Sequence, residues 1–240
     1  MSSELVMQRG DVTTACHSQR KTDGPTTCHT DHMTTTVATR MPEKMSRDRA
    51  ELDALLDSEI VGNVAYVHDD GTPGVLPTAV ARRGDELIVH GSTGSRWMRL
   101  VSGAPVAVSV TAVGGIVVAR SAFESSLIYS SAVLFGSFRV LDGDDKAAAL
   151  DAITEKLIPG RLAEVRPNSK KELAATLVLA LPITEWSLRT SDEWPEDTEA
   201  DIAADAWGGQ VRFAARAATV VAAPDLRSGI RVPESVRAFE

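Results

Sequence analysis

Residues 105–119 read PVAVSVTAVGGIVVA. Valine occupies every second position from 106 to 110, and small or polar residues separate the valines. This period of two is typical of a β-strand with one buried face. Gly114-Gly115 predicts a two-residue turn, after which residues 116–119 return as a second strand. The stretch therefore predicts an antiparallel hairpin.

Further strand signals flank this hairpin on both sides. Turn clusters such as Asp69-Asp70-Gly71 and Arg82-Arg83-Gly84-Asp85 separate short apolar runs. The other expected strands cover residues 62–68, 75–81, 87–90, 127–140 and 176–188, and helices are expected near residues 46–58, 97–101, 142–157 and 169–175. Consecutive strands on tight turns form antiparallel sheets. We therefore expect an α+β protein built on an antiparallel barrel of about six or seven strands, with three or four flanking helices.

The chain divides into three parts. Residues 1–44 are rich in threonine and poor in apolar runs, which favours a flexible tail. Residues 45–210 form the expected folded domain, and residues 211–240 are a C-terminal extension whose structure the pattern does not predict. Both cysteines and three of the five histidines lie in the tail, as Cys16-His17, Cys28-His29 and His32. Their spacing fits no standard zinc site, so we expect no metal.

Charge and hydropathy exclude several classes of function. The formal net charge of −8 argues against a nucleic-acid-binding surface. The first thirty residues lack the apolar segment of a secretory signal. The uncharged run from Leu100 to Ala119 contains glycine, proline and polar residues that disfavour a membrane helix. We therefore expect a cytoplasmic protein with no membrane partner and no nucleic-acid partner.

One local segment has the chemistry of a phosphate site. His90-Gly91-Ser92-Thr93-Gly94-Ser95-Arg96 follows an expected strand and leads into an expected helix. Its glycines allow close approach of the backbone to a ligand, its hydroxyls are hydrogen-bond donors, and Arg96 supplies a bidentate cation. Serine and glycine before a helix also form a simple N-cap. Both interpretations remain open from the residues alone.

A second polar segment joins two apolar strands. Residues 119–126 are rich in hydroxyl groups, have Arg120 as their only base, and are followed by Tyr129-Ser130-Ser131. If buried, these groups need hydrogen-bond partners, which a bound polar ring system supplies. The alternative is an exposed loop in which Tyr129 covers the end of the barrel.

Several separated segments resemble the pyridoxamine 5'-phosphate oxidase-like, FMN-binding split-barrel superfamily. The resemblance is strongest to its flavin-nucleotide-binding branch, which is related to nitroimidazole-resistance proteins, and it extends from about Arg47 to Trp207. The segments that carry it are residues 76–80, 89–92, 118–123, 129–136, 159–161, 165–167, 171–176 and 206–209. The resemblance implies a split barrel that forms a homodimer, with FMN at the subunit interface.

The resemblance also implies a set of cofactor-binding residues. They come from a strand, from the strand-to-helix turn that binds the phosphate, and from the segments near the isoalloxazine edge. The set is Pro77, Thr78, Ala79, Val80, His90, Gly91, Ser92, Thr93, Ser95, Arg96, Arg120, Ser130 and Ser131. His90, whose ordinary pKa is near neutrality, and Tyr129, beside the expected flavin edge, are the candidates for a catalytic role.

This chain departs from the branch next to the expected flavin site. The branch usually carries two histidines after Phe123, and then Asn-Tyr-Arg-Ser. Here Glu124 and Ser125 replace the histidines, and Ile128 and Ser130 replace the asparagine and the arginine. These replacements remove hydrogen-bonding and cationic groups, which predicts weaker flavin binding or a different ligand.

Three functions fit these observations. The first is an FMN-dependent oxidoreductase that reduces a small or xenobiotic substrate with electrons from NAD(P)H. The second is a flavin- or haem-binding protein that stores or senses and does not turn over substrate. The third is a reductase that uses the deazaflavin F420. We expect the first, in which the cofactor performs the hydride chemistry and the protein binds and orients it.

Overall fold

The computed structural model describes residues 42–214 and 218–239. Residues 1–41 of the tail, which include both cysteines and the histidines beside them, lie outside this range. The helices are η1 (Pro42–Lys44), α1 (Arg49–Ser58), α2 (Arg96–Val101), α3 (Gly143–Leu157), η2 (Arg161–Ala163), α4 (Lys170–Ala175), α5 (Glu199–Ile202) and α6 (Glu234–Arg237). The strands are β1 (Met45–Ser46), β2 (Val61–Val67), β3 (Pro73–Ala79), β4 (Ala81–Arg83), β5 (Glu86–Ser92), β6 (Pro105–Val118), β7 (Ser126–Ser137), β8 (Arg139–Leu141), β9 (Thr176–Pro182), β10 (Glu185–Ser191) and β11 (Gly209–Arg212).

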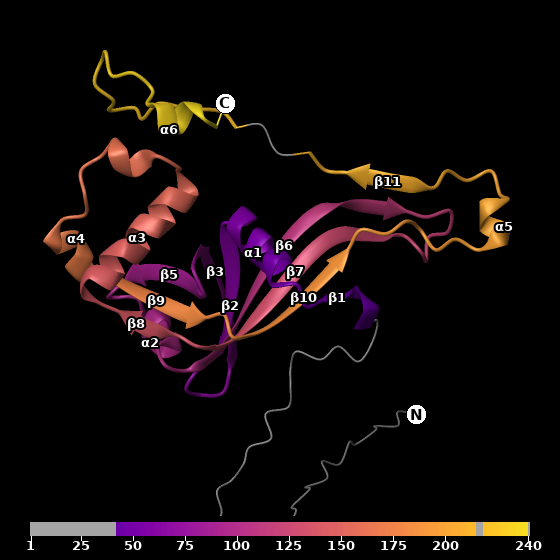
Figure 1. Cartoon of the computed structure of the whole chain (residues 1–240), viewed down its shortest axis with the longest axis horizontal. Coiled ribbons are helices and arrows are strands. Elements are labelled where there is room, and N and C mark those ends of the chain that lie inside the picture. Colours follow the sequence, from indigo (N-terminus) through magenta and orange to yellow (C-terminus); the bar gives the residue numbers. More distant parts are fainter. Residues whose placement is uncertain (1–41, 215–217, 240) are drawn as a thin grey trace, which may run out of the picture. The chain divides into compact units, whose positions relative to one another are not determined.

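The strands form two antiparallel sheets, which confirms the predicted α+β class (Figure 1). One sheet has the order β1-β10-β7-β6-β2-β3, with β11 also paired to β6, and the other has the order β4-β5-β9-β8. The two sheets do not join into one closed barrel. The strand and helix counts exceed the prediction because several elements span only two to four residues, such as β1, β4 and α5.

Three expected strands each cross from one sheet to the other, so their expected extents were wrong. Residues 75–81 divide between β3 and β4, residues 127–140 between β7 and β8, and residues 176–188 between β9 and β10. A continuous run of apolar residues does not reveal where a chain crosses from one sheet to the other. Each half of the run is buried, so the hydrophobic pattern continues across the crossing.

The predicted turn at Gly114-Gly115 was also wrong. β6 continues through both glycines and pairs with β7 over its whole length, with a register shift between Val113 and Gly115. Gly114 is therefore the extra residue of a β-bulge. The amide of Phe213 donates a hydrogen bond to the carbonyl of Gly114 at 2.8 Å, so the bulge meets the segment that follows β11.

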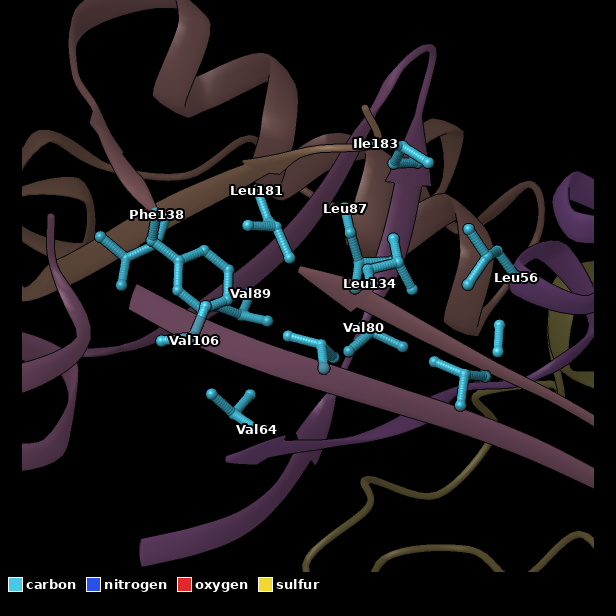
Figure 2. Packing of buried hydrophobic residues seen from close by; sticks show 14 of the residues in the cluster. Leu56, Val64, Val80, Leu87, Val89, Val106, Leu134, Phe138, Leu181 and Ile183 are labelled. Carbon is cyan, nitrogen blue, oxygen red and sulfur yellow. The ribbon is translucent and has the colours of Figure 1, made fainter. Parts of the chain in front are cut away.

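The main hydrophobic core lies between the two sheets (Figure 2). Val64, Val106 and Leu134 of the larger sheet meet Val89 and Leu181 of the smaller sheet. Leu52, Leu55 and Leu56 of α1 close one side of this core, as their helical spacing predicts.

A smaller core lies beneath α3. It joins Ala149 and Ile153 of α3 to Ile88, Val178 and Ala180 on the opposite face of the four-stranded sheet. No helix among the described residues is long and apolar enough to cross a membrane. The long β6–β7 hairpin extends beyond both cores, with β10 and β11 beside it (Figure 1).

Candidate functional site

A groove follows the core-facing side of the β6–β7 hairpin where the hairpin leaves the core. Its floor is a row of small side chains, because Ala112 pairs with Ser130 and Ser130 pairs with Thr190. These residues share a sheet face with the buried Ala132 and Leu188, two positions further along their strands. The hydrophobic core therefore continues directly into an accessible surface made of short side chains.

Helix α1 forms one wall of this groove. The cavity between α1 and the floor has a volume of about 540 Å³ and is lined by Glu51, Ala54, Leu55, Ser58, Ala112, Ser130, Leu188 and Thr190. A second cavity of about 250 Å³ shares the three floor residues and is lined in addition by Gly114, Ile128, Tyr129, Ser191, Asp192 and Arg212. The shared floor makes the two cavities one continuous groove. Its size and its mixture of apolar walls with a few hydroxyls are typical of small-molecule sites.

The groove contains two of the residues that the sequence singled out. Ser130 lies in its floor, and Tyr129 lines its distal part although its side chain shares the opposite sheet face with its partner Val113. Ser131 is adjacent in sequence, but its side chain points to the opposite face of the sheet. There its hydroxyl lies 3.1 Å from the hydroxyl of Thr111.

The predicted cofactor strand lies far from this groove within one chain. Pro77 pairs with Asn63 of β2, which pairs with Ser109 of β6, and Ser109 pairs with Val133 of β7. Three strand spacings separate Pro77 from β7, a distance of about 14 Å. Val80 is fully buried in the main core, whereas Thr78 and Ala79 are half-buried. The structure does not bring Pro77–Val80 to Ser130 within one subunit.

The predicted phosphate turn follows β5 in the smaller sheet. Its hydrogen bonds join it to the end of α4 and to residues of the turn itself. The amide and the hydroxyl of Thr93 donate to the carbonyl of Ala175, and the amide of Gly94 donates to the hydroxyl of Ser92. Ser95 is the N-cap of α2, but its hydroxyl makes no capping hydrogen bond. The Arg96 side chain is exposed and forms no ion pair with any described residue. The turn lies on a different sheet from the groove, and its role in binding phosphate remains a prediction.

Gly91 in the same turn has a steric role. A Cβ atom at this position would lie 3.1 Å from Cγ of the buried Met98. The close packing of β5 on α2 therefore favours glycine here. The glycine found by the sequence analysis thus supports the strand-to-helix packing as well as the turn.

Arg120 is engaged in an ion pair. Its guanidinium lies 2.8 Å from Asp197, whose side chain is 1% exposed. The backbone amide of Arg120 donates to the same carboxylate at 2.8 Å. Gly208 packs against the guanidinium, since a Cβ atom there would lie 2.9 Å from one of its nitrogens. Arg120 therefore anchors the acidic segment that follows β10, and its predicted contact with a cofactor remains untested.

His90 lies apart from the groove. It pairs with Val178 and shares the sheet face of Ile88, so its side chain points toward α3 and the smaller core. Burial lowers the pKa of its imidazole, and its Nδ1 is buried without a hydrogen-bond partner among the described residues. His90 is therefore neutral at pH 7, and the two catalytic candidates, His90 and Tyr129, lie on different sheets.

This burial predicts a pH-dependent stability. The unfolded chain binds the proton of His90 with an ordinary pKa of about 6.5, and the folded chain binds it less tightly. The unfolded state therefore holds more protons below about pH 6.5, so stability falls as pH decreases through that value. We expect His90→Gln to reduce this loss, as measured by urea unfolding between pH 7 and pH 5. An unchanged pH dependence would contradict a desolvated His90.

Sequence reasoning missed most of the groove. Glu51, Ala54 and Ser58 lie on a helix that the pattern identified only by its leucines, and Thr190 lay beyond the last expected strand. Arg212 lies in the segment for which no structure was predicted. The alternation of Trp186 and Leu188 with polar residues could have placed Thr190 on the core-facing side, once its strand was separated from β9.

Two antiparallel sheets packed on one core, with flanking helices, define the class of split α+β barrels. The chain belongs to the pyridoxamine 5'-phosphate oxidase family, whose model matches residues 48–190. No curated protein matches the sequence.

Two solved structures are similar over most of the chain. The FAD and haem binding protein from Mycobacterium smegmatis is 51% identical, with a TM-score of 0.79 over 82% of this chain and 97% of that one. The flavocytochrome Anf3 from Azotobacter vinelandii is 28% identical, with a TM-score of 0.79 over 85% of this chain and 96% of that one.

Proposed function

We propose that this protein binds a flavin in the groove between α1 and the β6–β7 hairpin and uses it in electron transfer. The observation that carries the proposal is the groove itself, whose floor of Ala112, Ser130 and Thr190 is flat and partly polar. The 51% identity to an FAD and haem binding protein, over nearly its whole length, supports the same assignment.

The residues of the groove fit a flavin ring. Ala54 and Ala112 offer apolar contact, and the hydroxyls of Ser58, Ser130 and Thr190 offer hydrogen bonds to a polar ring edge. When bound, the flavin supplies the hydride and electron chemistry, and the protein supplies binding and orientation. Of these hydroxyls, Ser130 stands where the family branch usually carries an arginine.

We propose FAD as the flavin, in place of the FMN expected from the sequence. The support is the Mycobacterium smegmatis protein, which is described as binding FAD. Because the Ser92–Arg96 turn lies on a different sheet from the groove of its own chain, we propose that it contacts a phosphate group of the flavin held by the other subunit of a homodimer. NAD(P)H remains the proposed electron source, and a small or xenobiotic molecule the proposed substrate.

A haem group is the second proposal, since two similar proteins are described as haem-binding or as a flavocytochrome. Haem iron accepts a neutral imidazole nitrogen as an axial ligand. His68 follows β2, is half-buried, and its ring nitrogens form no hydrogen bond with described residues. It is the accessible histidine of the described residues, because the other, His90, faces the core beneath α3.

The first experiment is the visible spectrum of the purified full-length protein. We expect a flavin band, and denaturation should release FAD at about one molecule per chain. A Soret band that is lost in His68→Ala, while the flavin band remains, would support the haem proposal. A colourless protein that does not retain added FAD would overturn flavin binding, and release of F420 would support the deazaflavin alternative.

The same sample tests turnover and assembly. Anaerobic bleaching of the flavin band by NADPH or NADH supports an oxidoreductase, and no bleaching by either supports a non-catalytic flavin protein.

We also propose a homodimer. Val61, Val75 and Val113 lie on the outward sheet face and are 49%, 66% and 50% exposed, and light scattering should give twice the mass of one chain.

A further inference from the structure

The segment after the family-matched region returns to the groove. We name residues 206–213 the β11 strap, because β11 pairs antiparallel with the distal half of β6. The contact is close at Gly115, where a Cβ atom would lie 2.3 Å from the carbonyl oxygen of Val211. Only glycine permits this approach, so Gly115 has a specific role in seating the strap.

The register of the strap places Arg212 on the groove side of the sheet. Arg212 pairs with Gly115, and Gly115 pairs with Ile128. Paired residues point to the same face, and Ser130 lies on that face two residues from Ile128. Arg212 accordingly lines the groove together with Ser130. Without the bulge at Gly114, the alternation along β6 would place Gly115, and with it Arg212, on the other face.

The guanidinium of Arg212 is held at the far end of the groove by two partners. It contacts the carboxylate of Asp192 at 3.1 Å and 2.5 Å, and it donates to the side-chain oxygen of Gln210 at 3.2 Å and 3.0 Å. These four contacts leave one of its five N–H groups without a partner among the described residues. Arg212 is thus oriented and still able to donate one hydrogen bond.

The charged residues that line the groove limit which ligand groups the remaining N–H of Arg212 can bind. Its charged lining residues are Glu51, Asp192 and Arg212, which together carry one net negative charge. A phosphate group would be repelled by this balance. An uncharged polar ring edge is not repelled, and the Arg212 guanidinium directly beside it would stabilise the negative charge that the ring gains on reduction.

We infer that Arg212 supplies the cationic hydrogen-bond donor for the pyrimidine edge of the flavin, and that the negative charge of Asp192 weakens the effect of this cation on the flavin. The inference rests on the proposed flavin site and adds a residue beyond the family-matched domain. In this arrangement, Arg212 favours the reduced flavin over the oxidised flavin. Asp192 opposes that preference because its negative charge offsets the guanidinium.

The test is the midpoint potential of the bound flavin in the full-length protein, with FAD as the probe. We expect Arg212→Gln to weaken binding of reduced relative to oxidised FAD about five- to tenfold, which lowers a two-electron potential by roughly 20 to 30 mV. Asp192→Asn should shift the potential in the opposite direction. The matched control is Arg166→Gln, which removes an arginine from another exposed ion pair on a different part of the chain and should leave the potential unchanged.

The outcomes separate this inference from the proposed function. Opposite shifts in the two variants support the inference, because loss of structure alone would move both potentials in the same direction. Suppose that both variants bind FAD and have a wild-type melting temperature. If their midpoint potentials are then unchanged or shift in the same direction, the role of Arg212 is overturned and the proposed flavin site stands. A wild-type protein that retains no FAD overturns both.

Discussion

Ala112→Trp is expected to abolish flavin binding while the protein still folds. Ala112 is the floor residue shared by both parts of the groove, and its side chain is only half-buried. An indole would occupy the space above Ser130 and Thr190, and tryptophan is well tolerated in strands. Loss of about 3 kcal/mol of binding free energy corresponds to more than a hundredfold lower affinity. The measurement is a titration of apoprotein with FAD, followed by flavin fluorescence.

Ala50→Trp is the control for this prediction. Ala50 is an exposed alanine in the first turn of α1 and does not line the groove. The same bulk at this position should leave FAD affinity unchanged. If Ala112→Trp binds FAD as tightly as the wild type, the flavin site lies elsewhere on the chain.

The second large effect is expected for Asp197→Ala. Asp197 is almost completely buried, and its carboxylate accepts both the backbone amide and the guanidinium of Arg120. Its removal leaves a partly buried amide and a partly buried cation without their acceptor, at a cost of about 1–3 kcal/mol. We expect a lower melting temperature and faster amide hydrogen exchange in β11, because the carboxylate ties the chain before β11 to the end of β6.

The location of the exchange effect distinguishes this role from general destabilisation. Amides of β9 in the smaller sheet should keep their protection at temperatures well below melting, while those of Val211 and Phe213, whose N–H groups face β6, lose it. A uniform loss of protection across both sheets would contradict the anchoring role. Arg166→Gln breaks an exposed ion pair with Glu172 and should have a much smaller effect on melting.

Several elements follow from the sequence for local physical reasons. The leucines at helical spacing identified α1, and Ser169 with Glu172 identified a capping box that the structure contains. The alternation from Val106 onward identified the core-facing side of β6. These signals depend on neighbours within a few residues, which the sequence places together.

Where the structure differs from the expectation, the cause is a contact with a segment far along the chain. Gly114-Gly115 has the sequence of a hairpin turn, but the structure uses it as a bulge because β11, which begins nearly a hundred residues later, approaches that point. Arg120 has in Asp197 a partner from a distant segment that its local sequence does not reveal, and its predicted contact with a cofactor stays a prediction. In each case, a residue far along the chain determines the role of the local motif.

By itself, the sequence determined the α+β class, the antiparallel pairing and the family, because hydrophobic period, turn residues and ordered motifs are local properties. Only the tertiary structure determined the groove. It joins a helix, three strands and a strap that are separated by up to 160 residues, through the register of Ala112, Ser130 and Thr190 and the bulge at Gly114. Register and bulge position follow from packing between distant segments, and no local pattern specifies them.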